Sequence, residues 1–182
     1  MNIKLETERL TLREILFSDE EALFELDSNP NVQKYVGNKP VQEREEIKKL
    51  IQNLRQQYID NGIARWAIID KKTNEFIGWS GIKLIKDSMN NHVNFYELGY
   101  RLIEKHWGKG IATETTIALV NYAFKNLQTE NLYAICDIEN KGSKNVLEKT
   151  GLTLVETFNH EGIEHNWFKI TKEEWNKIKP NK

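Results

Sequence analysis

The feature that most constrains the fold is a strand pattern that runs through a glycine-containing loop into a helix pattern. Residues 94–103 read as a long strand, residues 111–124 have helical apolar spacing, and Trp107-Gly108-Lys109-Gly110 lies between them. Such a turn aims several main-chain N–H groups at one point, where the helix dipole adds partial positive charge. The segment therefore predicts a site for a phosphate or diphosphate at the entry to the helix.

The other segments alternate between strand and helix patterns on both sides of this unit. Strands are expected over residues 9–15, 65–70, 76–84, 132–138, 152–158 and 163–170, and helices over residues 18–26, 41–58, 142–149 and from 171 onward. Ser18 and Glu21 form a predicted capping box, as do Thr171 and Glu174. We expect Ile117, with Val120 and Phe124, on the buried face of the helix over residues 111–124.

This order of elements predicts an α/β (α+β) fold with a central mixed sheet of about seven strands. Antiparallel hairpins at both ends, with a strand–helix–strand unit between them, imply helices on both faces of the sheet. The chain has 182 residues, so we expect residues 1–182 to form a single domain.

Charge and composition exclude several classes of partner. The 26 Lys and Arg residues balance 27 Asp and Glu residues, so no overall attraction to nucleic acid or to an anionic membrane is expected. No stretch is apolar enough to span a bilayer, and one cysteine, Cys136, cannot form an intramolecular disulfide. The expected compartment is the cytoplasm, and any anion site must be local.

The loop by itself admits two interpretations. A short Gly-x-Gly sequence is often only a tight turn, with Lys105 and Lys109 solvated beside it. The Walker pattern fails because no Gly-Lys-Ser/Thr ending follows, and the dinucleotide pattern fails because the loop follows an antiparallel meander. The phosphate hypothesis therefore needs further motifs.

Those motifs occur along most of the chain. They are Tyr96-Glu97-Leu98-Gly99-Tyr100, Trp107-Gly108-Lys109-Gly110-Ile111-Ala112-Thr113-Glu114, Asn140-x-x-Ser143 and Glu148-Lys149-x-Gly151-Leu152. Together they resemble the GNAT (GCN5-related) N-acetyltransferase superfamily. The opening Glu8-Arg9-Leu10-x-Leu12-Arg13 is similar to that of the ribosomal-protein N-terminal acetyltransferase (Rim-type) branch. The resemblance implies a GNAT fold with a mostly antiparallel, twisted sheet and a wedge between splayed strands that holds the cofactor.

The resemblance also implies acetyl-CoA as co-substrate, without a metal, and a set of residues that bind it. It implies that the loop binds the diphosphate. The pantetheine arm is expected to bind to a bulged strand, the one before the loop, and to the start of the helix over residues 142–149. The implied residues are Leu102, Ile103, Trp107, Gly108, Lys109, Gly110, Ile111, Ala112, Thr113, Asn140 and Ser143. Trp107 stands where Gln or Arg is usual, which matters little because main-chain amides make the contacts.

Acetyl transfer to an amine needs a base for the amine and a proton for the departing thiolate. Glu97 is the candidate base, acting directly or through water, although it could equally be a structural or substrate-orienting carboxylate. Glu161 and Glu164 are alternatives for the same task. By resemblance, Ser143 occupies the position of the group that protonates sulfur, and its alternative role is a helix N-cap.

The sequence favours direct transfer in a ternary complex to a primary amine, either a protein N-terminus or a small amine. Cys136 has no His–acid partner for a covalent mechanism, and His160 and His165 fit no common zinc pattern. The alternative function is a non-catalytic acyl-CoA-binding or regulatory module. The patterns leave open the identity of the acceptor and whether the protein is a monomer or a homodimer.

Overall fold

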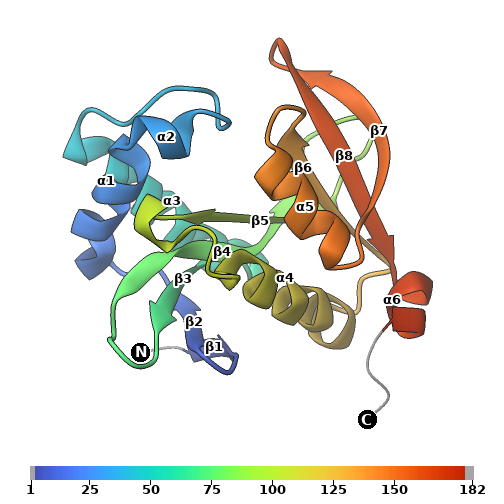
Figure 1. Cartoon of the computed structure of the whole chain (residues 1–182), viewed down its shortest axis with the longest axis horizontal. Coiled ribbons are helices and arrows are strands. Elements are labelled where there is room, and N and C mark those ends of the chain that lie inside the picture. Colours follow the sequence, from blue (N-terminus) through green and yellow to red (C-terminus); the bar gives the residue numbers. More distant parts are fainter. Residues whose placement is uncertain (1–2, 179–182) are drawn as a thin grey trace.

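Eight strands form one continuous sheet in the computed structural model, which describes residues 3–178 (Figure 1). The strands are β1 (Ile3–Glu6), β2 (Leu10–Glu14), β3 (Arg65–Asp70), β4 (Phe76–Ile85), β5 (Phe95–Leu102), β6 (Asn131–Asp137), β7 (Thr153–His160) and β8 (Ile163–Thr171). Their order is β1-β2-β3-β4-β5-β6-β8-β7, and only β5 and β6 pair in parallel. The mixed, mostly antiparallel sheet is confirmed, and the unpredicted β1 brings the strands to eight.

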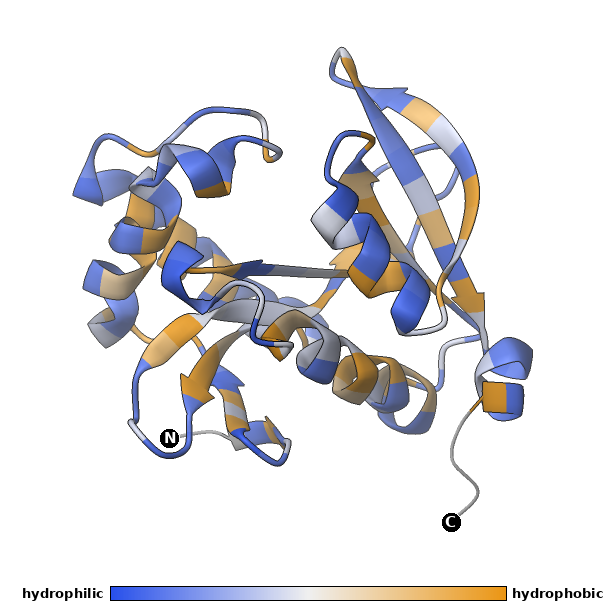
Figure 2. Ribbon diagram, viewed as in Figure 1, coloured by the Kyte–Doolittle hydropathy of each residue, from blue (hydrophilic) through white to orange (hydrophobic). Residues whose placement is uncertain are grey.

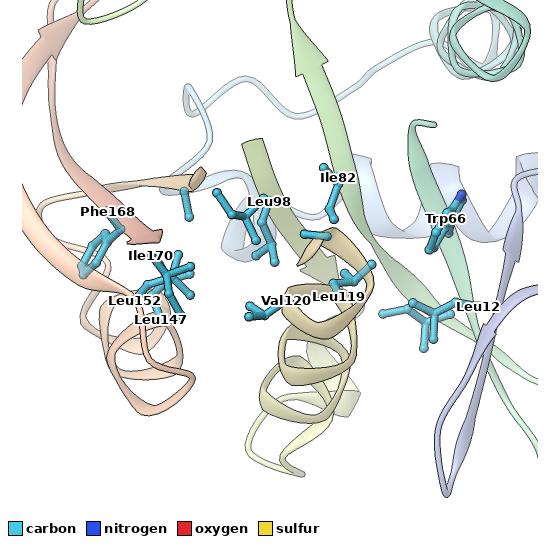
Figure 3. Packing of buried hydrophobic residues seen from close by; sticks show 14 of the residues in the cluster. Leu12, Trp66, Ile82, Leu98, Leu119, Val120, Leu147, Leu152, Phe168 and Ile170 are labelled. Carbon is cyan, nitrogen blue, oxygen red and sulfur yellow. The ribbon is translucent and has the colours of Figure 1, made fainter. Parts of the chain in front are cut away.

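Helices cover both faces of this sheet and enclose two main apolar clusters. They are α1 (Glu20–Ser28), α2 (Pro30–Gln33), α3 (Arg44–Asn61), α4 (Ile111–Tyr122), α5 (Lys141–Lys149) and α6 (Lys172–Ile178). One cluster joins α4 and α5 to one face, as Leu98, Leu119 and Leu147 show in Figure 3. The other joins α1 and α3 to the opposite face. Figure 2 shows hydrophobic residues mainly where helices meet the sheet, and hydrophilic loops.

One predicted helix start differs from the structure. Ser18 does not cap α1; instead the carboxylate of Asp19 accepts a hydrogen bond from the Leu16 N–H (2.8 Å) and pairs with Arg13 in the interior. A buried ion pair therefore takes the place of the expected serine cap. α1 ends at Ser28, and a separate short helix, α2, then begins at Pro30 with Asn29 as its cap, because proline is well tolerated in the first turn of a helix.

The buried face of α4 also differs from the prediction. Ile117 is 47% exposed, whereas Thr115 and Thr116 are fully buried. The hydroxyl of Thr115 donates to the Ile111 carbonyl (3.1 Å), so this polar side chain is satisfied inside its own helix. A reading based on apolar residues alone misses such a position.

The predicted helix ends in the last third of the chain are confirmed. Thr171 and Glu174 form the expected capping box: the Glu174 N–H donates to the Thr171 hydroxyl (3.1 Å) and the Thr171 N–H donates to the Glu174 carboxylate (2.7 Å). Gly151 follows α5 with φ +92°, the conformation that favours glycine at a helix C-terminus. These local signals fix where α5 and α6 lie against β8.

The two parallel strands separate soon after they meet. Only Glu97 with Tyr133 and Leu98 with Ala134 pair between β5 and β6, while β5 runs on to Leu102 and β6 to Asp137. The predicted wedge between splayed strands is confirmed. No helix among residues 3–178 has the length and apolar character to cross a membrane.

The bulge expected in the strand before the loop lies in its neighbour instead. β5 pairs with β4 in unbroken register, and the extra residue is Ile77 of β4, opposite β3. Next to it, Gly78 has φ +153°, and a Cβ there would lie 2.2 Å from the Arg101 carbonyl oxygen. Only glycine allows this close approach of β4 to β5.

Candidate functional site

A cleft of about 570 Å³ opens where β5 and β6 separate. One wall comes from α2 and the residues after it, the floor from the end of β5 and the following loop, and the other wall from α5. In Figure 1, α2 and α5 stand on opposite sides of this opening. The lining residues are Asn31, Val32, Tyr35, Val36, Tyr100, Arg101, Leu102, His106, Trp107, Gly108, Gly110, Ile111, Ala112, Thr113, Asn140, Gly142, Ser143, Asn145, Val146 and Lys149.

The loop before α4 presents a row of main-chain donors to this cleft. Gly108 (φ +72°) and Gly110 (φ +76°) both adopt the left-handed conformation, which turns the chain sharply into the helix. Within residues 3–178, the N–H groups of residues 108–113 donate no hydrogen bond. Six consecutive free donors beside a helix N-terminus have the arrangement of an anion cradle, the name used for residues 108–113 below.

Arg9 holds this loop against the N-terminal part of the sheet. Its guanidinium donates to the Lys109 carbonyl (3.1 Å) and, through Nε, to the Glu114 carboxylate (2.6 Å). Burial opposes the ionisation of Glu114, but the bonds from Thr7 and Arg9 outweigh it and hold the pKa of Glu114 below its usual value. Glu114 therefore stays charged, and its charge is matched by Arg9 close to the anion cradle.

Neither lysine of the loop lines the cleft. Lys105 does not add its charge to the cradle, because its ammonium group pairs with Glu75 (2.7 Å). That bond holds the pKa of Glu75 below its usual value. Lys109 lines a separate hollow of about 240 Å³ behind the loop. His106 lines both hollows, with its Nε2 3.5 Å from Glu75.

Of the two predicted contacts just before the loop, Leu102 and Ile103, only Leu102 lines the cleft. Leu102 lines the cleft, and its carbonyl accepts a hydrogen bond from the indole nitrogen of Trp107 (2.9 Å). Ile103 does not line it: its N–H donates to the Ile77 carbonyl (2.9 Å), and its side chain is buried with α1 and α3. Trp107 is 45% exposed and lines the cleft, so part of its side chain is accessible to a ligand.

Asn140 and Ser143 lie together at the start of α5. The Asn140 carboxamide accepts from the Ser143 N–H (3.0 Å), so Asn140, and not Ser143, is the N-cap. This leaves the Ser143 hydroxyl available, and it lies 2.9 Å from the hydroxyl of Tyr100 on β5. Burial raises the pKa of Tyr100, which keeps its hydroxyl protonated. The pair places two hydroxyl groups in the cleft, across the gap between β5 and α5.

Glu97 lies in the sheet beside the cleft and does not line it. It is 9% exposed and forms an ion pair with Arg65 of β3. The same guanidinium donates to the Gly81 carbonyl (2.7 Å) and packs against Gly99, where a Cβ would lie 2.9 Å from it. Glu97 is therefore held in a fixed orientation by Arg65 inside the sheet.

The alternative carboxylates lie at the far end of the last hairpin. Glu161 occupies the turn with φ +51°, and Glu164 accepts a hydrogen bond from Asn159 (3.0 Å). Both are exposed and neither lines the cleft.

The remaining reactive side chains take no part in the cleft. Cys136 is buried, and this burial raises the pKa of its thiol. His160 and His165 face one another on the hairpin with ring centroids 6.2 Å apart. Among residues 3–178, no three His, Cys, Asp or Glu side chains come together as metal ligands would.

Sequence reasoning missed three residues that shape the site. Tyr100 is part of a motif that the sequence revealed but received no role of its own, although its hydroxyl lies 2.9 Å from that of Ser143. Arg65 and Arg101 were not singled out, although each pairs with a carboxylate and lies over Trp79 at 5.2 Å. The available signal was an arginine inside an otherwise apolar strand, which requires a buried partner.

Comparison with known proteins agrees with this geometry. The family model described as "Acetyltransferase (GNAT) domain" matches residues 9–153. The uncharacterized N-acetyltransferase p20 of Bacillus licheniformis is 35% identical over 143 residues, which are 79% of this chain and 78% of that protein.

Solved structures share the fold over nearly the whole chain. A GNAT-family acetyltransferase from Bacillus anthracis has a TM-score of 0.76 at 27% identity, covering 95% of this chain and 99% of that one. Spermidine N-acetyltransferase from Vibrio cholerae, solved with CoA and spermine, has a TM-score of 0.75 at 21% identity, covering 93% and 99%. Given the match to the family model and the relatives named N-acetyltransferases, this chain belongs to the GNAT family and is an acetyl-CoA-dependent acetyltransferase.

Proposed function

We propose that residues 1–182 act as one unit that transfers the acetyl group of acetyl-CoA directly to a primary amine in a ternary complex. The observation that carries this proposal is the row of six unengaged N–H groups at residues 108–113; of these residues, all but Lys109 line the cleft at the splay of β5 and β6. A diphosphate placed there would direct the pantetheine arm along the open edge of β5, past Leu102. The thioester would then approach Tyr100 and Ser143.

In this proposal one residue protonates the departing thiolate and another accepts the proton of the amine. The Ser143 hydroxyl gives a proton to the thiolate of CoA as the C–S bond breaks, and Tyr100 orients that hydroxyl from 2.9 Å. Asn140 fixes the start of α5 and offers its amide group to the pantetheine arm. The loop amides from Gly108 to Thr113 bind the diphosphate.

For the amine proton we propose Glu97, acting through a water molecule. Its ion pair with Arg65 holds the carboxylate in place on β5, three residues from Tyr100 and on the opposite face of the strand. Glu161 and Glu164 are less suitable because they are exposed at the hairpin end and absent from the cleft lining. Direct transfer is favoured because the Cys136 thiol is buried and its raised pKa disfavours the nucleophilic thiolate.

The relatives favour the enzyme over a non-catalytic acyl-CoA-binding module, because they are named N-acetyltransferases. The test is an acceptor screen that follows thiol release from acetyl-CoA with peptides, amino acids, polyamines and aminoglycosides. We expect release with at least one class of amine and calorimetric binding of CoA without an acceptor. Failure of CoA to bind would contradict the proposal.

A further inference from the structure

Arg101 is a charged residue that lines the cleft, and its side chain lies on the α1 side of the sheet. Its neighbours on β5, Tyr100 and Leu102, face α5 and α4. Side chains alternate along a strand, so Arg101 points to the opposite face. There it pairs with Asp27 of α1, close to the wall formed by α2. The phosphate loop lies on the other face, so Arg101 is not part of the anion cradle.

The guanidinium of Arg101 is held rigidly from two sides. Asp27 is 2% exposed and also accepts from the Gln33 amide (3.1 Å), so its carboxylate cannot turn away. The ring of Trp79 lies 5.2 Å from the guanidinium carbon. This support fixes the orientation of the group before any ligand arrives, which lowers the entropy lost on binding.

One edge of this guanidinium is unused. Only Nη1 of Arg101 has a hydrogen-bond partner within residues 3–178, and the side chain is 18% exposed. The remaining Nε and Nη2 donors form the planar edge that binds a carboxylate with two parallel hydrogen bonds, or a carbonyl oxygen with one. Because Arg101 lines the cleft, a bound ligand with an oxygen acceptor can satisfy this edge.

The charges of the cleft also disfavour polyamines. Among the residues that line it, Arg101 and Lys149 are cationic, and none is Asp or Glu. A polyamine would bring additional ammonium groups into a site without a carboxylate to receive them. An acceptor with a single amine and a nearby oxygen fits these charges better.

We propose that the acceptor is an α-aminoacyl group, in which the amine and a carboxyl or carbonyl carbon share one carbon atom. The Nε and Nη2 edge of Arg101 binds the oxygen of that group and presents the amine to the thioester near Tyr100. The inference rests on the proposed function and narrows its acceptor. The oxygen can come from a free amino acid or from the first residue of a peptide.

The test compares amines that differ only in this oxygen-bearing group. Thiol release from acetyl-CoA is measured with the amides of alanine, histidine and phenylalanine, and with ethylamine, histamine and phenethylamine, which lack the carbonyl carbon. The free amino acids and matching dipeptides separate the two sources of the oxygen, and spermidine serves as the polyamine. We expect kcat/KM to be about 10–100-fold higher for an α-aminoacyl acceptor than for its matched amine, as charged hydrogen bonds allow.

Arg101→Lys tests the residue without leaving Asp27 unpaired. Lysine keeps the positive charge but lacks the planar edge, so we expect the preference to fall about 10-fold or more while calorimetric CoA affinity and the melting temperature stay unchanged. The matched control is Arg44→Lys, another arginine paired with a carboxylate and lying over a ring (Phe24, 4.9 Å), outside the cleft lining.

The outcomes separate this inference from the proposed function. Thiol release with amines but without the preference, or an unchanged preference in Arg101→Lys, overturns the inference and leaves the proposed function standing. Absence of release with every amine overturns both.

Discussion

Replacing Gly108 by Asp or by Asn tests the anion cradle by changing charge at constant shape. Gly108 has φ +72°, and a Cβ there meets no atom within 4 Å, so both side chains fit. Asn and Asp also tolerate the left-handed conformation better than other residues, which keeps the strain of the two variants similar. Gly110 is less suitable, because a Cβ there faces the Arg9 guanidinium at 3.7 Å, where an acid would gain a partner.

The expected magnitude follows from the position of Gly108 in the cradle. A carboxylate on its side chain would lie about 6 Å from a diphosphate held by the loop amides, given ordinary hydrogen-bond lengths. Repulsion by two phosphate charges then costs about 1.4 kcal/mol at the dielectric constant of water and about 5 kcal/mol at the value typical of protein surfaces. CoA should therefore bind at least about 10-fold more weakly to Gly108→Asp than to Gly108→Asn.

The assay is calorimetric titration of CoA at low and at high salt, because screening should shrink the difference. The control pair is Gly62→Asp and Gly62→Asn. Gly62 has φ +70° and equally open surroundings, but it ends α3 and does not line the cleft. Equal CoA affinity of the Gly108 Asp and Asn variants at low salt would refute the assignment of the loop.

Three further predictions follow from the same structure. Ser143→Ala should lower kcat about 10–100-fold with CoA affinity unchanged, and Tyr100→Phe should lower kcat less; equal losses in kcat and affinity would make Ser143 a cofactor contact only. Gly99→Ala places a Cβ 2.9 Å from the fixed Arg65 guanidinium and should destabilise the fold by about 1–3 kcal/mol in urea titration; unchanged stability would show that Arg65 moves freely. Burial raises the pKa of Cys136, so iodoacetamide at pH 8 should alkylate it far more slowly in the native than in the urea-unfolded protein, and equal rates would contradict that burial.

Local signals in the sequence accounted for most of the sheet and for the phosphate loop. Alternation of apolar residues located seven strands, and the glycines around Lys109 located the turn into α4. Those features depend on neighbouring residues, so a single sequence contains them. The short helix α2 was not predicted, because it depends on Asn29 capping the turn that begins at Pro30.

Long-range pairing was the part that the sequence could not supply. Glu97 and Arg65 are 32 residues apart, and nothing in either segment indicates that glycines leave room for the guanidinium between them. Asp19 replaced Ser18 at the start of its helix because Arg13 is buried beside it. Such partners are set by strand order and register, which emerge only once the chain has folded.

The central claim is that the main-chain amides of residues 108–113 bind the diphosphate of CoA. A crystal structure of the protein with CoA tests it most directly. We predict phosphate oxygens within about 3 Å of these nitrogens, the usual length of such hydrogen bonds, with the pantetheine arm between β5 and β6. A diphosphate bound elsewhere, with these six amides facing only solvent, would contradict the claim.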